Sequence, residues 1–144
     1  MIRFGETRCG WLARNVPVRM RDGVALATTV MLPRGDGPFP AVLIRTAYNR
    51  TNYNDTSYPA NGMALVVQDT RGRYDSGGEH YPFTSETADG LDTLAWLERQ
   101  PWCNGKIGMV GASYLAASQF LLAPAEGNRL HALSPQFMAG DCWK

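Results

Sequence analysis

The chain has 144 residues, which fits one domain of ordinary size, and its composition, 44% hydrophobic and 19% charged, is that of a soluble globular protein. A net charge of +1 favours neither nucleic acid nor an anionic membrane as a partner. No apolar run approaches the ~18 residues of a membrane span, and the N-terminus lacks the apolar core of a secretory signal, so we expect a cytoplasmic protein.

Cysteine and histidine are scarce and scattered. The three cysteines, Cys9, Cys103 and Cys142, are far apart and form no C-x-x-C pair, so we expect free thiols. The two histidines, His80 and His131, are too few for most metal sites. We therefore expect neither a metal nor a cofactor.

The first recognisable structure along the chain is a β-hairpin over residues 16–33. Apolar residues alternate with others in its first strand, the sequence R-D-G at 21–23 supplies the turn, and residues 25–31 form the return strand. The hairpin predicts that the sheet begins with antiparallel strands.

Downstream of the hairpin, strands alternate with helices. Continuous apolar runs predict buried strands at residues 41–46, 63–70 and 106–111, and a further strand at 130–137. Helical spacing predicts helices at 85–100, with Ser85 as N-cap and Pro101 as the stop, and at 113–123. This order implies an α/β fold with a mostly parallel sheet, in which ligands bind at the carboxyl ends of the strands.

Ser113 stands at the corner between an expected strand and an expected helix. A serine nucleophile needs exposure, a base and donors for the oxyanion, and a tight strand-to-helix turn supplies the exposure and the donors. The usual elbow sequence is G-x-S-x-G, whereas residues 111–115 read G-A-S-Y-L, with a small residue only at Ala116. Taken alone, the stretch fits either a nucleophile elbow or a helix N-cap serine in a nucleotide-binding α/β protein, although the Rossmann spacing G-x-G-x-x-G is missing.

Several motifs in order resemble one family. "IRTAYNR" is similar to an R-T-P-Y segment, "DTRGRYDSGGEHYPF" to D-x-R-G-x-x-x-S-x-G, and "ETADGLDTLAWLERQPW" to an acidic helix that leads into a Q-P-W turn. Together with "GASYLAASQ", they resemble the X-Pro dipeptidyl-peptidase and cocaine esterase family of α/β-hydrolases over nearly the whole chain. The resemblance favours the elbow and implies the N-terminal part of an α/β-hydrolase fold.

The resemblance also implies roles for three residues. Ser113 would be the nucleophile, the backbone N–H of Tyr114 would donate to the oxyanion, and the Tyr48 hydroxyl would be the second donor. Two positions depart from the family pattern: Ala47 replaces a proline, which is expected to loosen the loop that aims Tyr48, and Ala116 replaces a glycine.

A second segment of the resemblance, residues 69–76, is interpreted as loop-building. It contains Asp69, Arg71, Asp75 and Ser76. Here we expect an ion pair between Arg71 and either Asp69 or Asp75.

The resemblance implies a triad in the order Ser, Asp, His, with both partners well downstream of the elbow. Only 31 residues follow Ser113, and we expect His80 and His131 to be surface or packing residues. Residues 1–144 are thus expected to be the N-terminal portion of a catalytic domain, without the cap, the triad Asp and His, or the C-terminal β-sandwich. The strand at 130–137 would then be an exposed edge, open to self-association or to docking with the missing portion.

The expected function is that of a serine hydrolase, acting on a small-molecule ester or an X-Pro peptide-like amide in the parent protein. Residues 1–144 alone are expected to be inactive or nearly so, because no imidazole activates Ser113. The alternative is a non-catalytic α/β module that acts by assembly with another chain.

Overall fold

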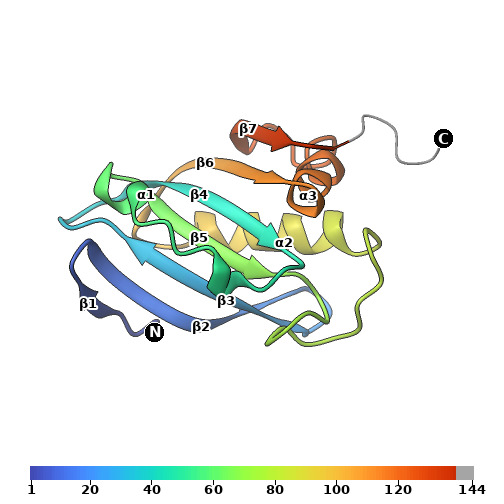
Figure 1. Cartoon of the computed structure of the whole chain (residues 1–144), viewed down its shortest axis with the longest axis horizontal. Coiled ribbons are helices and arrows are strands. Elements are labelled where there is room, and N and C mark those ends of the chain that lie inside the picture. The colour runs from blue at the N-terminus through green and yellow to red at the C-terminus, as the bar shows by residue number, and fades with distance from the viewer. Residues whose placement is uncertain (139–144) are drawn as a thin grey trace.

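A seven-stranded sheet forms the centre of the computed structural model, which describes residues 1–138 (Figure 1). Its strands lie in the order β1-β2-β3-β5-β4-β6-β7. The strands are β1 (Gly5–Thr7), β2 (Gly10–Arg19), β3 (Ala25–Leu32), β4 (Phe39–Thr46), β5 (Ala64–Asp69), β6 (Cys103–Ala112) and β7 (Leu130–Gln136). β1, β2 and β3 pair antiparallel, β3 pairs antiparallel with β5, and the four strands from β5 to β7 across the sheet are parallel. The predicted antiparallel start and parallel remainder are confirmed.

The predicted hairpin is present as β2 and β3, but β2 begins earlier than the alternating pattern indicated. A bulge interrupts the β2–β3 pairing between Ala13 and Val16, and Asn15 in this bulge has φ 54°. Strand β1 was not predicted, because three residues are too few to show a period.

Two helices of the predicted kind accompany the sheet. α2 (Glu86–Glu98) lies behind the sheet in Figure 1. α3 (Tyr114–Leu122) packs beside α2 and against β6 and β7. Ser85 occupies the predicted N-cap position of α2, although its side chain makes no capping hydrogen bond. A 3₁₀ turn, η1 (Arg50–Asn52), and a short helix, α1 (Ser57–Ala60), fill the connection between β4 and β5. None of the helices among the described residues is long and apolar enough to cross a membrane.

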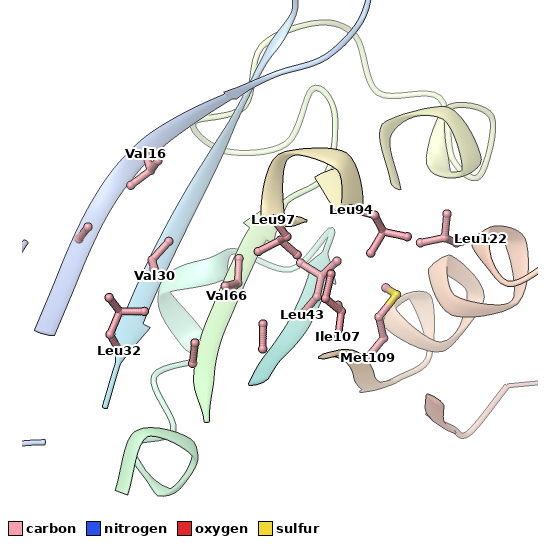
Figure 2. Close-up of a cluster of buried hydrophobic side chains, with 13 residues drawn as sticks. Val16, Val30, Leu32, Leu43, Val66, Leu94, Leu97, Ile107, Met109 and Leu122 are labelled. Carbon is pink, nitrogen blue, oxygen red and sulfur yellow. The ribbon is translucent and has the colours of Figure 1, made fainter. Parts of the chain in front are cut away.

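The main apolar core lies between the sheet and α2 (Figure 2). Leu94 and Leu97 of α2 point toward side chains from the central strands, among them Leu43 and Ile107, and all four are fully buried. Burying a side chain of this size stabilises a fold by roughly 1.5–3 kcal/mol. The core therefore fixes α2 on the central strands, whose carboxyl ends carry the site.

β7 forms one edge of the described sheet. It pairs with β6 alone, and most of its residues are exposed, Leu133 among them. The predicted exposed edge strand is confirmed for the described residues. Among the cysteines, Cys9 and Cys103 are free thiols, as predicted, and Cys142 lies outside the described residues.

The strand order favours a functional site between the carboxyl ends of β4 and β6. From β4 the chain moves to β5 on one side, and from β5 it crosses back to β6 on the other side of β4. The loops that follow β4 and β6 therefore leave neighbouring carboxyl ends in opposite directions, and it is at such a point that α/β sheets bind ligands. Tyr48 follows β4, and Ser113 follows β6.

Candidate active site

Ser113 occupies the single residue between β6 and α3, which confirms the predicted corner. Its side chain is exposed, and its backbone has φ 59° and ψ −123°, a conformation that non-glycine residues rarely adopt. Such a conformation costs about 1–3 kcal/mol and persists only where the surroundings impose it. A strained, exposed serine at a strand end indicates a functional residue rather than a simple helix cap, and it makes no side-chain capping bond to α3.

The residues around Ser113 explain how the turn is enforced. Gly111 has φ 145°, and a Cβ at this position would lie 2.4 Å from the Cβ of Leu115, so only glycine fits. The Ser113 N–H donates to the Gln136 carbonyl of β7 at 3.0 Å, and the Ser113 carbonyl accepts from Ala116 and Ala117 at 2.9 and 3.0 Å. The corner is thus held both by the neighbouring strand and by the first turn of α3.

Tyr48 reaches Ser113 from the loop after β4. The distance between the Tyr48 hydroxyl and Ser113 Oγ is 3.0 Å, although 65 residues separate them in the sequence. The Tyr48 N–H donates to Thr46 Oγ1 at 2.9 Å, and the Tyr48 carbonyl accepts from the Asn52 side chain at 2.9 Å. The Tyr48 phenol thus lies beside the Ser113 hydroxyl, which is the proximity that its expected part as a donor requires.

Because Ala47 replaces a proline of the family pattern, the loop that carries Tyr48 was expected to be loose. Polar contacts restrain this loop instead. Ala47 is buried, and its carbonyl accepts a bond from Arg73 Nε at 3.1 Å. Arg50, two residues beyond Tyr48, is 2% exposed, and its backbone N–H donates to Asp69 Oδ1 at 2.7 Å. Its guanidinium also pairs with the Asp69 carboxylate and with Asp75.

The expected ion pair of Arg71 with Asp69 or Asp75 was wrong. Both carboxylates pair with Arg50, whereas Arg71 pairs with Asp89 at 2.6 Å and Asp22 at 2.7 Å. The register explains the difference, because Thr46 lies opposite Asp69 and brings the loop after β4 over that carboxylate. Ser76 has the expected loop-building part: its hydroxyl donates to the Asp69 carbonyl at 2.7 Å.

Tyr114 directly follows Ser113, and its backbone and its buried side chain have different surroundings. As the first residue of α3, it has a backbone N–H with no acceptor inside the helix. Its side chain is 8% exposed, its hydroxyl donates to Glu86 Oε1 at 2.8 Å, and its ring stacks on Phe83 at 4.9 Å. Burial and the Glu86 carboxylate raise the pKa of this phenol above its usual value.

The two histidines lie where the sequence predicted, in packing and surface positions. His80 has Nδ1 at 3.2 Å from the Arg71 carbonyl, and its ring lies 6.1 Å from the Tyr114 ring. His131 is exposed near the amino end of β7, whereas Gln136 at the other end of that strand contacts Ser113. Within the described residues, Tyr48 is the hydrogen-bond partner of the Ser113 hydroxyl.

Comparisons with known proteins agree with this geometry. The sequence profile described as X-Pro dipeptidyl-peptidase (S15 family) matches residues 22–144. The cocaine esterase of Rhodococcus sp. (strain MB1 Bresler) is 38% identical over 141 residues, covering 92% of this chain and 25% of the esterase. The chain therefore spans about a quarter of the length of the curated relatives it matches.

Solved structures show the same fold. A CocE/NonD family hydrolase from Staphylococcus aureus is 25% identical with a TM-score of 0.79, over 90% of this chain and 28% of that one. An acetyl xylan esterase from Paenibacillus sp. R4 is 14% identical with a TM-score of 0.81, over 97% of this chain and 54% of that one, and is a likeness of fold alone. The chain has the α/β-hydrolase fold that the sequence predicted.

Proposed function

The chain belongs to the X-Pro dipeptidyl-peptidase (S15) family, and we propose that it supplies the nucleophile and the oxyanion hole of a serine hydrolase. The observation that carries the proposal is the 3.0 Å contact between the Tyr48 hydroxyl and Ser113 Oγ at a strained elbow. The substrate class is an ester or an X-Pro peptide-like amide, supported by the family and by the esterase relatives.

The proposed reaction is acyl transfer to water. Ser113 Oγ attacks the substrate carbonyl carbon and loses its proton to a base, and the carbonyl oxygen takes up the negative charge. The Tyr48 hydroxyl and the Tyr114 N–H donate to that oxygen, each such donor being worth a factor of about 10² to 10³ in rate. The intermediate expels the alcohol or amine after the base returns its proton, and water then releases the acid and restores Ser113.

We place the base and its orienting carboxylate outside residues 1–144. The described histidines do not contact Ser113, and the chain spans about a quarter of its curated relatives. In this proposal residues 1–144 are the N-terminal portion of a catalytic domain whose cap, triad Asp and His, and C-terminal β-sandwich are supplied by the parent protein.

A second candidate, a non-catalytic module that works by assembly, is favoured by one observation. Among the described strands β7 pairs with β6 alone and exposes most of its residues, and an edge strand of this kind is a template for another strand. Self-association or docking with the remainder of the parent protein would cover it.

A cytoplasmic location is supported by the free thiols Cys9 and Cys103, since reducing compartments preserve free thiols.

Turnover of p-nitrophenyl butyrate tests the proposal on three proteins: residues 1–144, the protein as its gene encodes it, and the same protein with Ser113→Ala. We expect turnover in the encoded protein, a loss of about 10⁴- to 10⁶-fold in kcat on Ser113→Ala, and little or none in residues 1–144.

Three results would contradict it. Brisk turnover by residues 1–144 would make His80 or His131 the base. Turnover that survives Ser113→Ala would remove the elbow serine from the reaction. No turnover by the encoded protein would favour the assembly module.

A further inference from the structure

One buried carboxylate, that of Glu86, joins three elements beneath the site. Glu86 is the first residue of α2 and is 4% exposed. It accepts a hydrogen bond from the Tyr114 hydroxyl of α3 at 2.8 Å and pairs with Arg45 Nη1 of β4 at 2.7 Å. The Glu86 carbonyl accepts from the same Arg45 nitrogen at 2.8 Å. Arg45 is fully buried, so this contact lies away from water on both sides.

The Glu86 carboxylate is connected to both proposed oxyanion donors, to one through Tyr114 and to the other through Arg45. Tyr114 carries one donor on its own backbone, so a fixed Tyr114 side chain limits how far that N–H can turn. The Tyr114 ring also meets the Tyr48 ring edge-on, with centroids 6.4 Å apart. Arg45 lies three residues before Tyr48 on the strand that delivers it.

Stability alone explains this arrangement poorly. A buried ion pair is often no more stabilising than apolar side chains of the same volume, because both charges lose their hydration. The Tyr114 hydroxyl also accepts a bond from the Phe83 N–H at 3.3 Å, so its direction is fixed from two sides. What the arrangement does provide is a single orientation for the residue that follows Ser113.

We propose that Glu86 and the Tyr114 phenol are positioning residues, which hold the Tyr114 N–H and the Tyr48 hydroxyl in the geometry that stabilises the oxyanion. This inference rests on the proposed serine hydrolase function. It assigns to the Tyr114 side chain a part that is separate from its backbone, and it gives Glu86 a part in the reaction without contact to the substrate.

The test measures transition-state stabilisation separately from substrate binding. In the encoded protein, kcat and KM for p-nitrophenyl butyrate are compared with the inhibition constant of butylboronic acid, whose adduct with serine is tetrahedral and anionic like the intermediate. Tyr114→Phe keeps the ring and the Glu86–Arg45 pair, and removes only the hydroxyl. We expect kcat to fall and the boronate to bind more weakly by the same factor, about 10- to 100-fold, with KM within about twofold.

A neighbouring hydrogen bond provides the matched control. Thr87 follows Glu86 on α2, and its hydroxyl donates to the Leu121 carbonyl of α3 at 2.9 Å, away from the elbow. Thr87→Val removes that tie between the same two helices, and we expect kcat and boronate affinity to stay within about twofold. Glu86→Gln should lower kcat at least as much as Tyr114→Phe, and the double variant should lose less than the product of the two losses, because the two groups act as a unit.

The outcomes separate the two proposals. Ser113-dependent turnover with unchanged kcat and boronate affinity in Tyr114→Phe overturns the positioning role and leaves the serine hydrolase intact. Equal losses in Thr87→Val and Tyr114→Phe make the contact a structural tie between helices, which also overturns it. No Ser113-dependent turnover in the unsubstituted protein removes the proposed function, and the inference falls with it. If Glu86→Gln fails to fold, kcat and boronate affinity in Tyr114→Phe still test the positioning role.

Discussion

Two buried regions of the molecule are held together by different forces. Between the sheet and α2, apolar side chains such as Leu43, Leu97 and Ile107 pack against one another (Figure 2). Beneath the carboxyl ends of β4 and β5, the equally buried side chains Arg45 and Asp69 are charged. Apolar packing tolerates small shifts, whereas a buried charge keeps its partner at one place and angle. The apolar region therefore accounts for the fold, and the charged region for the geometry of the site.

The charged region continues as a network of neutral groups. Gln68 Oε1 accepts bonds from Arg45 Nε at 3.1 Å and from the Thr93 hydroxyl at 2.9 Å. Gln68 in turn donates to the Thr28 hydroxyl at 3.2 Å, so the network crosses from β4 through β5 to β3. Substitutions here should affect positioning as well as stability, and substitutions in the apolar region should affect stability alone.

The largest expected effect on stability is at Asp69, the buried carboxylate at the end of β5 that holds the loop after β4. Asp69→Asn leaves the buried Arg50 guanidinium without its inner counter-charge, so we expect the free energy of unfolding to fall by about 3–5 kcal/mol, measured by urea denaturation. Asp75 contacts the same arginine with a side chain that is 64% exposed. Asp75→Asn is thus the control, with an expected loss of about 0–1 kcal/mol. Equal losses at the two positions would show that burial of the pair is not what matters.

The next effect concerns catalysis rather than stability. Tyr48→Phe removes the hydroxyl beside Ser113, so we expect kcat for p-nitrophenyl butyrate to fall by about 10²- to 10³-fold in the encoded protein, with little change in unfolding. Tyr74→Phe is the control, because Tyr74 is exposed and the hydrogen bond to Ser113 Oγ comes from Tyr48. Unchanged kcat in Tyr48→Phe would exclude the phenol as an oxyanion donor.

A smaller effect is expected in the apolar region. Ile107→Val deletes one buried methyl group from the core, and we expect the free energy of unfolding to fall by about 0.5–1.5 kcal/mol. The ratio kcat/KM should stay the same within error, because no polar contact of the site involves this side chain. A large fall in kcat from this variant would contradict the division between the two regions.

The smallest effect appears only in alkali. The pKa of the Tyr114 phenol is raised in the folded protein, so the folded chain holds this proton after the unfolded chain has lost it. The stability from this group is intact below about pH 10, the unfolded value, and declines as pH rises above it. Tyr114→Phe should therefore lose stability less steeply than the unsubstituted protein between about pH 9 and about pH 11 in denaturant titrations. Parallel curves would mean that the phenol titrates normally.

How far the sequence predicts this molecule depends on the range of each interaction. The hairpin, the alternating strands and helices, and the place of Ser113 follow from local periodicity and turn residues, and all were predicted. Tyr48 was predicted through its motif. The pairs Arg50–Asp69 and Arg45–Glu86 were not predicted, because their members lie 19 and 41 residues apart and meet only once the strand register is set. Arg71 was assigned the wrong carboxylates for the same reason.

The nucleophile can be tested directly by covalent labelling. A fluorophosphonate reacts with an activated serine and leaves a stable adduct, which peptide mass spectrometry locates. On the protein as its gene encodes it, we predict one adduct, on Ser113, and a parallel loss of p-nitrophenyl butyrate turnover. Ser118 lies five residues along α3 with a fully buried hydroxyl bonded to the Leu115 carbonyl, and should stay unlabelled. Loss of turnover with the adduct on any residue other than Ser113 would contradict the assignment of the elbow serine.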